Sequence, residues 1–76
     1  MNVKIIMFGK LADIAGNTVY VSDVVDTDGL IRNLNTAYPA LGGTKYAIAV
    51  NKQVVNSNTL LNENSVVALL PPFSGG

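Results

Sequence analysis

The last two residues of the sequence, Gly75 and Gly76, are the strongest candidates for chemistry. A glycine has no Cβ, so a narrow channel in another protein can close around a Gly-Gly backbone and reach the carboxylate of Gly76. A Gly-Gly pair alone is also compatible with a terminus that has no function. Here the pair follows a predicted strand and Pro71-Pro72, and this context favours a carboxylate that enters the active site of a partner.

Four residues before the glycines would carry this carboxylate: Pro71, Pro72, Phe73 and Ser74. We expect 71–76 to be a flexible tail, because no partner strand is evident for it. The five residues from Pro72 to Gly76 reach about 15 Å when extended. The prolines stiffen the base of the free tail and so lower the entropy that binding costs. Phe73 offers a bulky apolar anchor near the mouth of a channel.

The side chains offer no competing chemistry. The sequence has no Cys and no His, which removes thiol nucleophiles, imidazole bases and the usual zinc ligands. The acidic residues before Gly29 superficially resemble a calcium-binding loop. With Gly29 at the sixth position of such a loop, the first ligand position would be Val24 and the last would be Asn35 in place of a glutamate, so the motif fails. Nothing in the sequence brings Asp13 and Glu63 together as an acid–base pair. We therefore predict that this chain binds no metal and no cofactor.

Length and charge limit the function further. The chain has 76 residues with five basic and five acidic side chains, which suits one small domain. Balanced charge argues against a nucleic-acid or membrane partner, since an anionic surface calls for a basic excess. No apolar run approaches the roughly 18 residues of a membrane span, and the N-terminus shows no signal peptide pattern. A domain without disulfides fits a reducing compartment, so we expect a cytoplasmic protein.

The first third of the sequence predicts two strands around a short helix. In residues 3–8 alternate positions form the predicted core face: Val3, Ile5 and Met7. Residues 10–15 fit a short helical segment that Gly16 stops. Residues 18–21 are mostly β-branched or aromatic and predict a second strand, antiparallel to the first.

One longer helix follows. Thr27 is its predicted N-cap, and Pro39 sets its end because proline disfavours helical geometry in the residue before it. Four apolar residues share one face at helical spacing: Leu30, Ile31, Leu34 and Tyr38. Residues 41–43 predict a loop.

The C-terminal part of the domain predicts three strands. Residues 45–50 and 53–55 are joined by a turn at 51–52, and residues 65–70 form the last strand. That strand ends at Pro71, because proline cannot donate a hydrogen bond to a sheet ladder.

The loop at 56–65 is expected to be anchored by Leu60 and Leu61. Together, the predicted strands and helices of residues 1–70 indicate a two-layer α+β domain: a mixed sheet of about five strands, with one main helix on one face and the other face bare.

Three stretches of the sequence resemble the small, sulfur-carrying subunit of molybdopterin synthase. They are 8–16 (Phe-Gly-Lys-Leu-Ala-Asp-Ile-Ala-Gly), 49–51 (Ala-Val-Asn) followed by Val54, and 66–76 (Val-Val-Ala-Leu-Leu-Pro-Pro-Phe-Ser-Gly-Gly). The Pro-Pro-x-x-Gly-Gly ending is more typical of this branch than of other ubiquitin-like proteins, which share only Gly-Gly. The turn at 62–65 and Gly29 in the helix start depart from the family's usual pattern. The resemblance implies the ubiquitin-like β-grasp fold of the MoaD/ThiS proteins.

The resemblance also implies a mechanism. An E1-like adenylyltransferase would use MgATP to adenylate the Gly76 carboxylate, and a sulfur donor would convert it to a thiocarboxylate. In the large synthase subunit this sulfur would pass to cyclic pyranopterin monophosphate and build the dithiolene of molybdopterin. Two carriers would serve each pterin, in a heterotetramer of small and large subunits. Catalysis would come from the partners, and this chain would be the sulfur-donor subunit.

The bare sheet face is the expected docking surface. Phe8 and Leu70 alternate with predicted core residues and should point outward, with Val54 as a candidate neighbour. In the family that the sequence resembles, an apolar patch at matching positions meets both the activating enzyme and the large subunit. The alternative is that one or more of these three side chains belong to the core.

Other functions stay open. The chain could carry sulfur for thiamin thiazole or another pathway. It could be a protein modifier whose Gly76 forms an isopeptide bond with a lysine. It could also be a β-grasp binding module that is never activated. The Pro-Pro ending favours the molybdopterin pathway among these.

Overall fold

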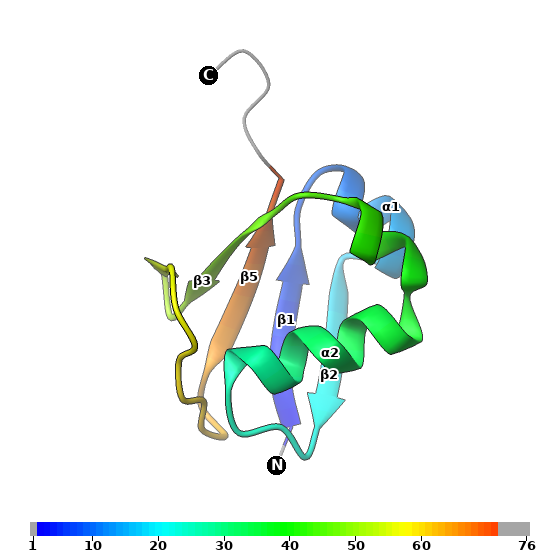
Figure 1. Cartoon of the computed structure of the whole chain (residues 1–76). Helices are drawn as coiled ribbons and strands as arrows, with labels where there is room; N and C mark the ends of the chain where they lie inside the picture. Colours follow the sequence, from blue (N-terminus) through cyan, green and yellow to red (C-terminus); the bar gives the residue numbers. More distant parts are fainter. Residues whose placement is uncertain (1, 72–76) are drawn as a thin grey trace.

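The computed structural model of the chain describes residues 2–71. In chain order the elements are β1 (Asn2–Met7), α1 (Lys10–Ala15), β2 (Thr18–Ser22), α2 (Thr27–Ala37), the 3-10 helix η1 (Pro39–Gly43), β3 (Ala47–Val50), β4 (Gln53–Val55) and β5 (Val66–Leu70). Figure 1 shows their arrangement. All the predicted strands and both predicted helices are present, close to the expected bounds.

The strands form one mixed sheet in the order β2-β1-β5-β3-β4. The first and last strands, β1 and β5, are parallel neighbours in its interior, with Ile5 opposite Val67. The other neighbouring pairs are antiparallel. The prediction of an α+β domain with a mixed sheet of about five strands is therefore confirmed.

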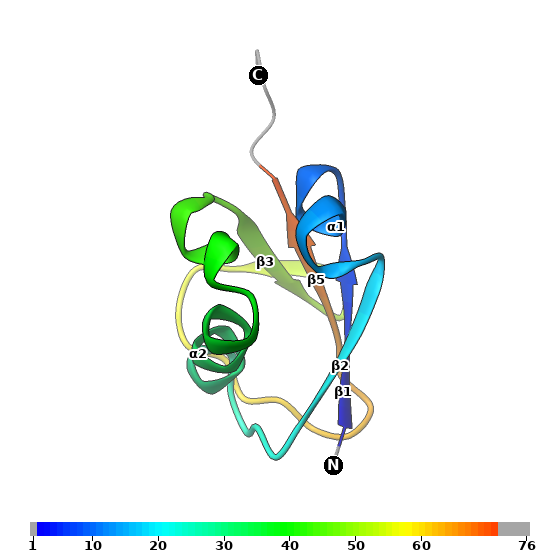
Figure 2. The same ribbon diagram turned by 90° about the vertical axis from the view of Figure 1, so that its right-hand side faces the viewer.

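The core fills the space between one sheet face and the helices. Buried residues alternate along β1 and β5 and follow one face of α2: Val3, Ile5, Met7, Val67, Leu69, Leu30 and Leu34. Figure 2 shows α2 lying on one side of the sheet, and no helix of the described residues covers the other side. None of the helices in residues 2–71 is long and apolar enough to cross a membrane.

The predicted N-cap of α2 is wrong by one residue. Asp26 caps the helix, and its Oδ1 accepts a hydrogen bond from the Gly29 N–H at 2.9 Å. Thr27 is buried, and its hydroxyl donates to Asn58 Oδ1 and accepts from the Thr59 N–H. Both Asp and Thr can cap a helix, and the contact with the loop at 58–59 decides between them.

The Asp26 cap predicts a fold that loses stability in acid. The Gly29 N–H, followed by the Asn58 side chain, holds the pKa of Asp26 below its ordinary value of 3.8. Because the folded-state pKa is the lower one, this stabilisation is present above the unfolded-state pKa and is lost as pH falls through the folded-state pKa. Asp26→Asn should therefore flatten the decline in the free energy of unfolding below about pH 4, measured by urea denaturation.

An Asn33→Ala control, at an exposed and uncharged position of α2, leaves the cap in place and should keep the wild-type decline. If Asp26→Asn declined as steeply as the wild type, the cap would not be the source of the acid sensitivity.

Two loop predictions are wrong. The sequence predicts a loop at 41–43, but these residues belong to η1, which buries Leu41. Leu60 is 80% exposed and anchors nothing, whereas Leu61 is buried. A hydrogen bond from the Leu61 N–H to the segment before α2 fixes this backbone, so only one of two consecutive side chains can face the core.

The predicted turn between β3 and β4 is confirmed. Asn51 and Lys52 both have positive φ, of 49° and 73°, as a two-residue type I′ hairpin requires. Asn51 also binds the hairpin to β5, because its N–H donates to Val66 O at 2.9 Å and its Oδ1 accepts from the Val66 N–H at 3.0 Å. The hairpin is thus held beside β5, and Val54 lies on the sheet.

Candidate functional site

The described chain ends beside the end of β1. Because β1 and β5 are parallel neighbours, their carboxyl ends meet at the same edge of the sheet (Figure 1). The Phe8 N–H donates to Leu69 O at 3.2 Å, and Pro71 follows two residues later. The other predicted tail residues lie outside the described residues: Pro72, Phe73, Ser74, Gly75 and Gly76. The division into a domain at 1–70 and a tail at 71–76 therefore stays a prediction.

The sheet face away from α2 carries the predicted docking residues. Phe8 is 45% exposed and Val54 is 59% exposed. Leu70 is half-buried, next to the fully buried Leu69, which faces the core. The alternative that Phe8 is a buried core residue is wrong. Binding of a partner by these three side chains stays a prediction.

The strand register adds residues that sequence reasoning did not include. Ile6 lies opposite Ala68, and Ala68 lies opposite Ala49. Ala49 in turn lies opposite Val54, so one row of apolar side chains crosses four strands. Together with the docking residues they form the sheet face that we call the open face: Ile6, Phe8, Ala49, Val54, Ala68 and Leu70. Ala49 lies within this face but is itself buried. Alternation within each strand indicates the face, but it carries no information on which residues of different strands become neighbours.

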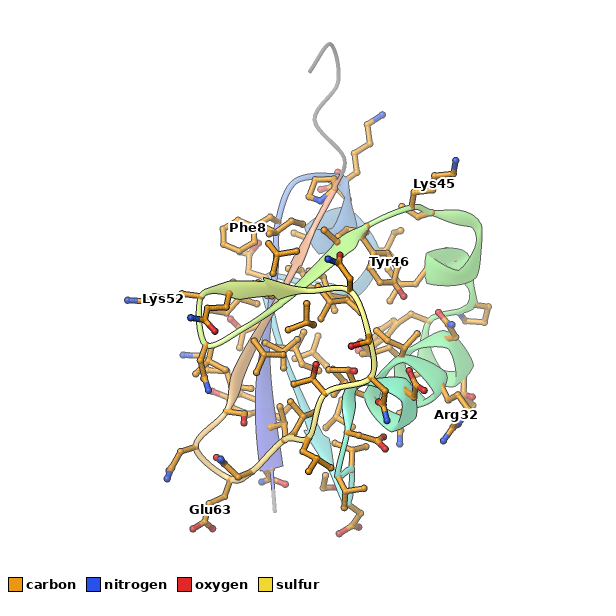
Figure 3. All side chains as sticks on the ribbon, turned by 60° about the vertical axis from the view of Figure 1, so that its left-hand side comes forward. Phe8, Arg32, Lys45, Tyr46, Lys52 and Glu63 are labelled. Carbon is orange, nitrogen blue, oxygen red and sulfur yellow. The ribbon has the colours of Figure 1, made fainter. Side chains whose placement is uncertain are left out.

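The open face is hollowed beside Phe8. A depression of about 420 Å³ is lined by Ile6, Phe8, Asn51, Lys52, Val66 and Ala68. Figure 3 shows Phe8 and Lys52 extending from the sheet on the side away from Arg32 of α2. The small side chain of Ala68 leaves room that larger side chains enclose. An apolar hollow with one cation at its rim suits a partner surface that is apolar at its centre.

The described side chains do not assemble a reaction centre. Within residues 2–71, no group of three His, Cys, Asp or Glu could hold a metal ion. Burial raises the pKa of Tyr46 above its ordinary value of 10.0, so its hydroxyl is protonated at neutral pH. Asp13 lies on α1 and Glu63 lies in the loop before β5. What the described part of the chain offers is a surface next to the point where the tail begins.

Similarity to known proteins extends along nearly the whole chain. Residues 5–76 match the sequence pattern of the ThiS family. The molybdopterin synthase sulfur carrier subunit of Dictyostelium discoideum is 30% identical over 81 residues, which cover 96% of this chain and 94% of that one. The family match runs to residue 76 and therefore includes Gly75-Gly76.

Two solved structures share the fold. A structure of the complex of subunits 1 and 2 of molybdopterin-converting factor from Helicobacter pylori contains a chain with a TM-score of 0.73 and 30% identity, covering 100% of both chains. The small archaeal modifier protein 1 from Methanosarcina acetivorans has a TM-score of 0.82 and 25% identity, covering 99% of this chain and 96% of that one. These similarities confirm the predicted ubiquitin-like β-grasp fold and the predicted resemblance: the chain belongs to the ThiS family.

Proposed function

We propose that this chain is the sulfur carrier subunit of a molybdopterin synthase, and that the carboxylate of Gly76 carries the sulfur. The observation that supports this most directly is the family match through residue 76, together with 30% identity to a subunit of that function. The absence of Cys and His from the sequence agrees with it. Without a thiol, sulfur has to be carried by another group, and the terminal carboxylate can carry it as a thiocarboxylate.

The chemistry requires activation before sulfur transfer. An E1-like adenylyltransferase joins the Gly76 carboxylate to the α-phosphate of MgATP and releases pyrophosphate. A sulfide-equivalent donor then attacks the acyl carbon, AMP leaves with the electrons of the broken C–O bond, and a thiocarboxylate remains. In the large subunit the thiocarboxylate sulfur attacks an oxygen-bearing carbon of cyclic pyranopterin monophosphate, and the C–O bond breaks as the oxygen leaves as water or stays on the phosphate. Water then cleaves the acyl C–S bond and returns the Gly76 carboxylate, so each carrier delivers one sulfur.

The open face is the part of this chain that would recognise both partners. It exposes apolar side chains next to the root of the tail, and its centre is hollowed. The five residues after Pro71 span about 15 Å when extended, enough to carry Gly76 from the interface into a buried active site. The Helicobacter pylori structure is a complex of the corresponding two subunits. By analogy we propose a heterotetramer of two small and two large subunits.

The proposal is tested in two stages. The chain is incubated with its activating enzyme, MgATP and a sulfur source, and its intact mass is recorded. We expect one oxygen to be replaced by sulfur, with the change confined to the C-terminal peptide. The thiocarboxylated chain is then mixed with the large subunit and the pterin precursor, and molybdopterin should form while the carboxylate form returns. A thiocarboxylate that forms but yields no dithiolene would contradict the assignment and favour thiazole synthesis or another sulfur pathway.

Protein modification is a second candidate function. The supporting observation is the higher TM-score to the archaeal modifier, 0.82 against 0.73. Both functions need the same adenylated Gly76, so they differ only in the acceptor. Lysine-linked conjugates of Gly76 recovered from cells, without dithiolene in the reconstituted reaction, would favour the modifier.

A further inference from the structure

The root of the tail is packed against a glycine at the end of β1. Gly9 has a φ of +56°, a conformation that L side chains rarely adopt. A Cβ placed on Gly9 would lie 3.0 Å from Pro71 Cγ and 3.8 Å from Pro71 Cδ. A contact of 3.0 Å is tighter than side-chain carbons normally make, so the pyrrolidine ring of Pro71 packs closely against the Gly9 backbone.

The backbone around Gly9 cannot easily move away. The Phe8 N–H donates to Leu69 O at 3.2 Å, which ties this turn to β5. The Ala12 N–H donates to Gly9 O at 3.1 Å, which ties it to α1. Leu11 in the same turn has no exposed surface and anchors α1 in the core. A methyl group added to Gly9 would therefore push Pro71 away by a few tenths of an ångström.

We propose that Gly9 is a positioning residue for the terminal carboxylate, because its missing side chain fixes where Pro71 lies and hence where the residues after it begin. This inference rests on the proposed function, since it matters only if Gly76 must reach a fixed point in a partner. The open face sets how the chain docks, and the contact between Gly9 and Pro71 sets where the tail starts relative to that docked surface.

Gly9→Ala should therefore lower turnover more than it weakens docking. A misplacement of about 1 Å can cost on the order of 100-fold in rate. The displacement of Pro71 is smaller than this, so we expect kcat to fall by about five- to tenfold in both thiocarboxylate formation and sulfur transfer. The KM for the carrier should change less than about threefold, because the exposed docking side chains remain.

Gly16→Ala is the matched control. Gly16 also has a positive φ, of +93°, and also flanks α1, but a Cβ there would meet nothing within 4 Å. Both substitutions strain the backbone, and only the one at Gly9 reaches Pro71. A loss of kcat that is confined to Gly9→Ala therefore reports the contact and not the strain.

Pro71→Ala supplies the rescue. It removes Cγ and Cδ, the two ring atoms that lie nearest to the added methyl group. In the double variant Gly9→Ala/Pro71→Ala, kcat should return to within about threefold of the kcat of Pro71→Ala alone. If the two substitutions acted independently, their fold losses of kcat would multiply. Pro71→Ala alone also removes the contact with native Gly9 in place, so it tests the inference even if Gly9→Ala does not fold.

The experiment measures kcat and KM of the full chain with its activating enzyme and with the large subunit, for the wild type and these four variants. In the free wild-type chain, NMR should show nuclear Overhauser effects between the Gly9 α-protons and the Pro71 ring. Four results would each overturn the inference. They are the absence of these nuclear Overhauser effects, a kcat of Gly9→Ala equal to that of Gly16→Ala, a kcat of Pro71→Ala equal to that of the wild type, and failure of the rescue in the double variant. If the wild-type chain acquires no sulfur, the proposed function is wrong, and the positioning role proposed for Gly9 is then wrong as well.

Discussion

Deletion of Gly76 is expected to abolish sulfur loading completely while leaving the fold unchanged. The variant still ends in a carboxylate, that of Gly75, but this group stops one residue short, by about 3.5 Å. Adenylation needs the carboxylate in line with the α-phosphate, and effective attack requires reacting atoms about 3–3.5 Å apart. A tail that ends one residue early cannot meet this distance from the same docked position. The readout is intact mass after incubation with the activating enzyme, MgATP and a sulfur source.

The matched control is Gly42→Ala, which alters an exposed glycine in η1 with nothing within 4 Å of the added Cβ. It should load sulfur at the wild-type rate. Both variants should keep the wild-type denaturation midpoint, since Gly76 is outside the described fold and Gly42 is free of contacts. Sulfur incorporation that persists in the deletion variant would contradict the prediction. On Gly75 it would show that the length of the tail does not matter, and on any other residue it would place the chemistry elsewhere in the chain.

The sequence predicts the layers of this fold well because each layer follows from local spacing. Alternation along 3–8 identifies Val3, Ile5 and Met7 as core residues, and the structure buries all three. Helical spacing likewise places Leu30 and Leu34 inward. These patterns state which face of an element is buried. They do not state which strands pair, so the order β2-β1-β5-β3-β4 rests on resemblance and not on periodicity.

The errors lie where two residues compete for one role. Asp26 and Thr27 can both cap α2, and Thr27 is drawn into hydrogen bonds with a loop thirty residues away in sequence. Leu60 and Leu61 can both anchor the same loop, and a single backbone hydrogen bond selects Leu61. In each case the decision comes from a long-range contact that no local pattern contains.

The candidate site shows the same division between what local patterns predict and what long-range contacts decide. Alternation places Phe8 and Leu70 outside the core, and the structure agrees for both. Ala49 joins them only through the register with β5 and β4. The contact between Gly9 and Pro71 could not be predicted from the sequence, because it depends on the close approach of Pro71 from the other end of the chain.

The second large effect is a contrast between the adjacent residues Leu69 and Leu70. Leu69 has no exposed surface, and Leu69→Ala should lower the free energy of unfolding by about 2–5 kcal/mol through lost burial and the cavity left behind. A domain of this size has about 4–11 kcal/mol in total, so this variant should be partly unfolded near body temperature. Urea denaturation measures the loss.

Leu70→Ser should give the opposite pattern. Leu70 is half-buried on the open face, so we expect the free energy of unfolding to change by about 1 kcal/mol or less. Its affinity for the large subunit should fall about tenfold or more, because truncating an apolar anchor at the centre of an interface is costly. Leu60→Ser is the control, because it makes the same change at a side chain that is 80% exposed and lies beside Asp26 at the start of α2, not on the open face. That control should keep full affinity. A loss of several kcal/mol in Leu70→Ser would make Leu70 a core residue, and unchanged affinity in a titration with the large subunit would remove it from the docking surface.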